Sequence, residues 1–513
     1  ANATETIYEG DSGVNVGIGL SSDILPRFVG NLDFNGDLEN GTGLNGFPAP
    51  RPGTGDLFGT GTVSAISGPF NASDDTSGQI AAEQRVWLNV SKGNLETHTM
   101  IEWDGVLDQG VIDDNDPNLE RVRVSYTAPS LGTKFNIGAD LFLASTVGRL
   151  VYVDDDPGMW ANGEVSGVTW QVGYHIRNEG SGAGGDSAER ADRVKFGGDH
   201  DVFSGRLGFS GSLGGNSSWY LEPFALVQNK QSEDSRFVPD PDDPDEVLTN
   251  TQATDKVAGY FGAGGRYKNG AFTIQGEFVT HQGEIRGTNI VSLRDDFDEN
   301  FDEMDISSFG AHTRFSLQNA VAGKLTPYFS WDWASGDSDP FDDDLEGFVP
   351  LGTSTALRAD NIQWARKSVV NQMPNAVGNE AVEFGFETIN LGVGPSLGGL
   401  TDRGFGANPG YHRLQAGLKG GLTGKWGVAT RVSYLRFDET DAAVAGAQAR
   451  GQDITDVDEE IGWGFDLEFP YQVMKEVSVT PFGSVFLPGD GAETLAGDDD
   501  IAFVSGFNVF ASF

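Results

Sequence analysis

Apolar and polar residues alternate with a period of two along many short segments of this chain. In the clearest example, residues 461–473, Phe465 and Leu467 alternate with Asp466 and Glu468. The same pattern occurs in residues 168–177, 309–318, 325–333, 426–434 and 501–513. A period of two places successive side chains on opposite faces of a β-strand. Aromatic residues end many of the apolar faces, which favours a membrane barrel over a soluble sandwich.

The connections between these segments also alternate, between short and long. Tight turns are expected at residues 91–94, 268–270, 423–425 and 474–476. Long polar insertions lie between them, at residues 105–117, 144–163, 230–253, 283–304, 336–377, 439–457 and 489–499. Short turns at one end and long loops at the other are typical of outer-membrane barrels, with the turns on the periplasmic side.

Composition supports the same fold. The chain of 513 residues has 72 Gly and 34 Phe, and no stretch approaches the ~18 consecutive apolar residues of a membrane helix. The sequence therefore predicts an all-β fold, a transmembrane antiparallel β-barrel of about 18 strands within a range of 16–20. We expect short periplasmic turns, long acidic extracellular loops and one domain over residues 1–513. Residues 22–79 are expected to be a long loop or an extra hairpin that could constrict the pore.

The charge of the chain excludes several classes of function. With 33 Lys and Arg against 76 Asp and Glu, the net charge is −43, which argues against nucleic acid as a partner. The chain has no Cys, so disulfides, thiolate metal sites and thiol nucleophiles are excluded. Its six His are scattered without metal-ligand spacing, and no nucleophile-elbow motif is present. We expect no enzyme activity and no cofactor, with a barrel protease or lipase as the enzymatic alternative.

The chain has few Lys and Arg residues, and many of them lie on the polar faces of the predicted strands. In a barrel this parity faces the lumen. The predicted pore-lining or constriction residues are Arg85, Arg121, Arg123, Arg177, Arg314, Arg413, Arg431, Glu102, Glu277 and Asp332. Two interpretations remain open: a structural network that satisfies buried charges, and a charged constriction that selects solutes.

Acidic residues are concentrated in the insertions. One cluster holds Asp337, Asp339, Asp342, Asp343 and Asp344, and residues 295–305 form another. The first interpretation is a solvated acidic surface. The second is a divalent-cation site for an ion such as Ca²⁺, because carboxylates are hard oxygen ligands.

The chain ends on an aromatic residue, Phe513, that continues the apolar parity of residues 501–513. A final strand of this kind resembles the sorting signal of outer-membrane barrels. The resemblance implies recognition by the barrel-assembly machinery and a location in the bacterial outer membrane.

The whole pattern resembles Gram-negative porins, and one segment is similar to alginate-export-like barrels. That segment is residues 331–337, followed by an acidic loop and Phe348-Val349-Pro350. Likeness to ordinary porins implies a passive diffusion channel for small polar solutes and ions, a homotrimer, and contact with outer-membrane lipid and lipopolysaccharide. The alternatives are a substrate-specific channel for anionic sugars or organic acids, and a barrel sleeve around a periplasmic partner.

Overall fold

The computed structural model describes most of the chain. The described residues are 5–9, 13–30, 76–108, 111–112, 118–154, 156–176, 200–240, 243–291, 300–339, 342–348, 350–351, 409–449, 454–496 and 501–513. The region 22–79 lies largely outside this set: residues 22–30 and 76–79 belong to strands, and residues 31–75 are not described. Arg177 also lies outside the described residues.

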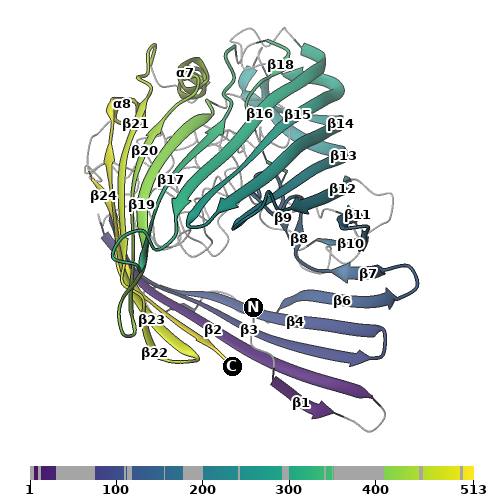
Figure 1. The fold of residues 1–513 in the computed structure, drawn as a ribbon. Coiled ribbons are helices and arrows are strands. Elements are labelled where there is room, and N and C mark those ends of the chain that lie inside the picture. Colours follow the sequence, from purple (N-terminus) through teal and green to yellow (C-terminus); the bar gives the residue numbers. More distant parts are fainter. Residues whose placement is uncertain are drawn as a thin grey trace.

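Strands dominate the described part of the chain (Figure 1). They are β1 (Glu5–Glu9), β2 (Val14–Gly30), β3 (Thr76–Lys92), β4 (Leu95–Asp108), β5 (Val111–Ile112), β6 (Asn118–Ala128), β7 (Thr133–Ala139), β8 (Phe142–Leu143), β9 (Val153–Asp154), β10 (Pro157–Val165), β11 (Val168–Ile176), β12 (His200–Gly211), β13 (Ser217–Asp240), β14 (Asp243–Asn269), β15 (Phe272–Val291), β16 (Asn300–Leu317), β17 (Leu325–Ala334), β18 (Asp344–Leu345), β19 (Tyr411–Thr423), β20 (Trp426–Arg436), β21 (Glu460–Glu468), β22 (Tyr471–Met474), β23 (Val477–Pro488) and β24 (Ala502–Ser512). The described helices are α7 (Thr440–Ala449) and α8 (Asp490–Ala496). None of the described helices is long and apolar enough to cross a membrane.

The long strands of the described residues close into an 18-strand antiparallel barrel. Its strands are β2, β3, β4, β6, β7, β10 to β17, β19, β20, β21, β23 and β24, with β22 continuing β21. Each strand pairs with the next, and β24 pairs back with β2. Closure leaves no open sheet edge, which is the condition for placing β-structure in lipid. The predicted fold class and the expected number of strands are confirmed.

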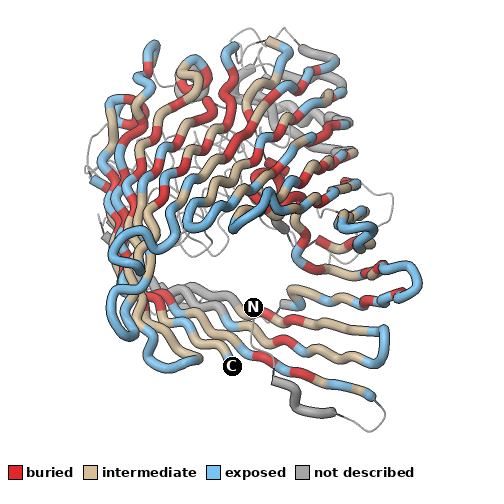
Figure 2. The backbone as a smooth tube through the Cα atoms, in the orientation of Figure 1, coloured by how far each residue is buried: buried red, intermediate tan, exposed pale blue. Residues whose placement is uncertain are grey.

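Alternation along the strands separates two faces of the wall (Figure 2). On β21, Phe465 is 43% exposed whereas the next residue, Asp466, is 2% exposed. On β17, Phe329 is exposed while Ser330 and Asp332 are buried. Apolar side chains therefore cover the outside of the barrel and polar side chains point inward, as the sequence pattern predicts.

The tight turns lie where the sequence places them, between β3 and β4, β14 and β15, β19 and β20, and β22 and β23. Gly93 and Gly270 adopt positive φ angles of 59° and 57° in two of these turns. Residues with a Cβ adopt this backbone conformation only at a cost in free energy. Because neighbouring strands are antiparallel, all four turns lie at the same end of the barrel.

Several of the polar insertions contain strand or helix, contrary to the expectation. Residues 230–253 are mostly strand, because β13 extends to Asp240 and β14 begins at Asp243. Residues 157–163 belong to β10. The insertions at 439–457 and 489–499 contain α7 and α8. A hairpin that continues beyond an apolar belt needs no apolar face, so hydrophobic alternation cannot reveal it.

The C-terminal residue completes the closing ladder. The backbone N–H of Phe513 donates to the carbonyl of Leu20 at 2.8 Å, and the N–H of Leu20 donates to the carbonyl of Phe513 at 3.0 Å. Its side chain is 53% exposed on the outer face. Phe513 therefore lies at the seam that joins the two ends of the sheet.

Deletion of Phe513 should reduce the yield of folded barrel, because the seam loses two hydrogen bonds and its terminal aromatic anchor. The measurement is the fraction of heat-modifiable protein recovered from outer membranes. Phe513→Tyr is the matched control and should assemble normally. Equal recovery of the deletion variant would contradict a sorting role for this residue.

Candidate functional site

The inner face of β16 to β21 carries ionic groups that are completely enclosed. The Asp332 carboxylate pairs with Nδ1 of His312 at 2.6 Å and accepts hydrogen bonds from Nε and Nη2 of Arg413 at 2.9 and 2.8 Å. Arg431 donates from Nε and Nη2 to Asp466 at 2.8 and 2.6 Å. Adjacent strands bring these groups together, since Arg413 lies opposite Asp332 and Arg431 opposite Asp466 in the ladders.

The exposure of these groups determines what they can contact. The side chains of Arg413 and Arg431 are 0% exposed, and that of Asp332 is 1% exposed. Arginine and carboxylate are almost never buried to this degree unless they are paired. Arg413, Arg431 and Asp332 therefore belong to the packed wall in this structure and present no surface to a passing solute.

A second group of charges, on β3 to β7, is more open. Arg85 forms an ion pair with Glu102, and its side chain is 31% exposed whereas that of Glu102 is 6% exposed. Arg123 pairs with Asp140, and their side chains are 21% and 11% exposed. In these two pairs the guanidinium is more exposed than the carboxylate, whereas the Glu96 side chain, at 38%, is more exposed than its partners Arg123 and Lys134.

Three more residues, Glu96, Lys134 and Arg121, extend this open group. Glu96 accepts hydrogen bonds from Nη2 of Arg123 and Nζ of Lys134, both at 3.0 Å. Arg121 precedes Arg123 by two residues on β6, and both are partly buried. Arg85, Arg121 and Arg123 lie on β3 and β6, which both pair with β4. All three are among the residues that the sequence predicts to line the pore.

Arg314 has a different environment on β16. Its guanidinium carbon lies 4.0 Å from the centroid of the Tyr328 ring on β17. Stacking of this kind stabilises a partly buried cation.

A segment between β7 and β10 folds into the barrel. Glu277, on the inner face of β15, accepts hydrogen bonds from the backbone N–H groups of Gly148, Arg149 and Leu150 at 2.7, 3.2 and 3.1 Å. Glu222, on β13, accepts from the N–H of Thr146 at 2.5 Å. We call residues 142–152 the inward segment. The sequence predicts residues 144–163 as an external loop, because no local pattern signals contacts with strands so distant along the chain.

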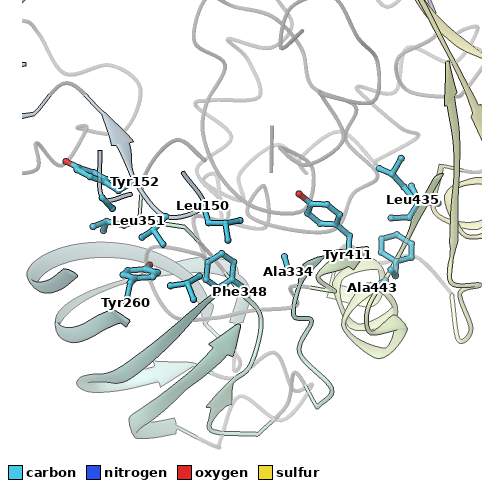
Figure 3. Packing of buried hydrophobic residues seen from close by; sticks show 14 of the residues in the cluster. Leu150, Tyr152, Tyr260, Ala334, Phe348, Leu351, Tyr411, Leu435 and Ala443 are labelled. Atoms are coloured by element: carbon cyan, nitrogen blue, oxygen red, sulfur yellow. The ribbon is translucent and has the colours of Figure 1, made fainter. Parts of the chain in front are cut away.

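The inward segment packs in an apolar cluster inside the barrel (Figure 3) with a second loop, which follows β17 and comprises the described residues 335–339, 342–348 and 350–351. Leu150 and Tyr152 are 0% exposed, and Phe348 and Leu351 of the second loop are 2% and 3% exposed. The Phe348 ring meets the ring of Tyr260 on β14 edge to face, with centroids 6.4 Å apart. Part of the barrel interior is therefore filled by packed side chains rather than open to water.

The second loop also carries the acidic cluster predicted to bind a cation. Asp337 is 2% exposed and accepts a hydrogen bond from the N–H of Asp339 at 3.2 Å. Burial, together with the neighbouring Asp342 carboxylate, raises the pKa of Asp337 to about 8. Asp343 and Asp344 are exposed. Among the described residues, no group of three side chains is arranged to hold a metal ion. A Ca²⁺ site in this loop stays a prediction.

Comparisons with known proteins give no family for the sequence. No protein family matches it, and no curated protein matches it. Among solved structures, Pseudomonas aeruginosa OccK5 (OpdH) aligns with a TM-score of 0.46 and 8% identity over 97% of both chains. Pseudomonas aeruginosa OccK2 (OpdF), in complex with glucuronate, aligns with a TM-score of 0.45 and 11% identity over 97% of this chain and 98% of that one. An anion-selective porin from Comamonas acidovorans gives 0.38 and 8% over 98% of this chain and 100% of that one.

Proposed function

We propose that the protein is a porin of the bacterial outer membrane, a passive diffusion channel for small polar solutes and ions. The closed 18-strand barrel with apolar side chains outside and polar side chains inside carries this proposal. The outer face suits contact with lipid, and the partly exposed charges on β3 to β7 suit a hydrated path. We extend the proposal to contact with lipopolysaccharide and to a homotrimer, which native mass measurement in detergent would test.

Conductance is the direct test of this function. The purified protein alone, added to a planar lipid bilayer, should produce stepwise current increases. A barrel sleeve would instead require a co-purifying periplasmic partner and conduct through a wide bore. Absence of current steps from folded, heat-modifiable protein would contradict the channel.

A preference for anions, including organic acids, is favoured by the guanidinium groups of Arg85 and Arg123, which are more exposed than Glu102 and Asp140, and is opposed by Glu96, which is 38% exposed. Fixed charge beside a narrow aqueous path raises the local concentration of counterions. We therefore expect weak anion preference or near neutrality at molar salt, despite the net charge of −43.

Changing both Arg121 and Arg123 to Gln should shift selectivity toward cations, and the shift should grow as the salt concentration falls. The measurement is the reversal potential across a salt gradient. A matched control changes Arg286 and Lys475 to Gln, since their side chains are 60% and 93% exposed at the rims. Strong cation selectivity that stays the same when Arg121 and Arg123 are changed would contradict an arginine-lined path.

A further inference from the structure

The inward segment has one charged side chain. In the stretch Phe142–Tyr152 (FLASTVGRLVY), every residue except Arg149 is uncharged. Arg149 is half-buried, whereas Leu150, Val151 and Tyr152 are 0% exposed. The segment therefore covers its apolar residues and leaves its single cation with access to water.

The accessible side of the segment faces the inside of the barrel. Glu277, which holds the segment, is 4% exposed, whereas the next residue on β15, Phe278, is 46% exposed on the outer face. The segment is also held from β12, where Nη1 of Arg206 donates a hydrogen bond to the carbonyl of Leu143 at 3.1 Å. Because Glu277 and Arg206 hold the segment from the inner face of the wall, the water that reaches Arg149 lies inside the barrel.

The position of Arg149 is fixed through its backbone. Its N–H donates to Oε2 of Glu277 and to Oγ of Ser145, both at 3.2 Å. Its φ angle is 58°, a left-handed conformation that is uncommon for a residue with a Cβ. Such conformations persist where surrounding contacts enforce them, and they occur disproportionately at functional sites. The Glu277 carboxylate supplies those contacts here, because it also accepts from the residues on either side.

Close approach of the segment to the wall depends on a glycine. A Cβ added to Gly148 would lie 2.6 Å from Cβ of Glu277 and 2.9 Å from its Oε2. Real Cβ atoms do not come this close to their neighbours, so another residue at position 148 would push the segment away from Glu277. The chain therefore combines a carboxylate on the wall with a glycine in the segment directly beside Arg149.

We infer that Arg149 is a selectivity-determining residue of the channel and that Glu277 is its positioning residue. The favoured solutes are small anions, including carboxylates, which a guanidinium binds through charge-assisted hydrogen bonds. The inference rests on the proposed channel function and adds a site, on the inward segment, distinct from the charges on β3 to β7.

The size of the effect follows from electrostatics. A unit charge about 6 Å from the path of an ion in water, screened at 0.1 M salt, changes the anion-to-cation permeability ratio about threefold. Arg149→Gln should lower this ratio by about that factor, and Arg149→Lys should preserve most of it. Arg286→Gln removes the same charge from the outward-facing parity of β15 and should leave the ratio unchanged.

Covalent restoration of charge provides a test that does not depend on comparing separately folded variants. The chain has no Cys, so Arg149→Cys introduces a single thiol. A cationic methanethiosulfonate reagent added to the open channel should raise the anion-to-cation ratio, and an anionic reagent should lower it. Equal ratios after the two reagents, with labelling confirmed by mass, would overturn the role of Arg149.

A double-variant cycle tests whether Glu277 acts through Arg149. Gly148→Ala, which pushes the segment away from Glu277 without changing any charge, should lower the anion-to-cation ratio and increase current noise, because the segment is held less firmly. In the Arg149→Gln background, Gly148→Ala should produce little further change in the ratio. Additive changes would overturn the positioning role. Absence of current from the unmodified protein would overturn the channel itself, whereas a channel indifferent to position 149 would overturn only this inference.

Discussion

Replacing Asp466 with Leu should destabilise the barrel by about 3–5 kcal/mol, the usual cost of removing one partner of a buried ion pair. The change takes the carboxylate from Arg431, whose side chain is 0% exposed and donates two hydrogen bonds to Asp466. Desolvation of the remaining guanidinium is then uncompensated. The measurement is the free energy of unfolding in urea, followed by tryptophan fluorescence of protein folded into lipid vesicles.

An exposed ion pair is the matched control for this experiment. Arg436 and Glu459 lie 3.0 Å apart with side chains 40% and 59% exposed, so Glu459→Gln should cost less than about 1 kcal/mol. Combining Asp466→Leu with Arg431→Met should recover part of the lost stability, because no charge is then left in the wall. Equal unfolding energies for Asp466→Leu and Glu459→Gln would show that the enclosed pair contributes no more than a surface pair.

Replacing Phe465 with Arg should cost roughly 2–4 kcal/mol if the residue lies near the middle of the bilayer. Phe465 is 43% exposed on the outer face of β21, between the exposed side chains of Trp463 and Leu467. Arginine there would have to be desolvated in lipid. We expect slower assembly and a lower unfolding free energy, measured as for Asp466→Leu. The same reasoning applies to Trp170→Arg on β11.

The depth of the substitution supplies the control. Val473 lies on the same odd-numbered parity as Phe465, in β22 directly before the tight turn at residues 474–476. Arginine at Val473 should cost only about 0–1 kcal/mol, because the penalty falls toward the interface. A single thiol at position 465 that reacts readily with a membrane-impermeant reagent on the folded barrel would contradict the lipid-facing assignment.

Local sequence pattern was sufficient for the barrel wall. Alternation at residues 461–468 predicts which side chains face outward because strand geometry fixes a period of two, whatever the rest of the chain does. The same rule identified β17, β20 and β24. It failed for residues 230–253, where polar residues predominate at both parities and the apolar ones, such as Phe237 and Val238, are adjacent rather than alternating.

The sequence alone also predicted that arginines occupy the inner face, but it could not rank them by exposure. Arg85 and Arg413 both sit on polar parities, yet the first is 31% exposed and the second is 0% exposed. The difference depends on what packs over each position inside the barrel. Contacts of that kind join residues from distant parts of the chain, so they leave no trace in local spacing.

The sequence by itself determined the antiparallel barrel wall and its outward-facing apolar parity, because these follow from backbone periodicity and burial of apolar surface. Only the tertiary structure decided how the interior is used. Glu277 meets Gly148 across 129 positions of chain, and Glu222 meets Thr146 across 76. Hydrogen bonds between such distant residues form only after the wall has closed, and they fix the inward segment and the cation that it carries.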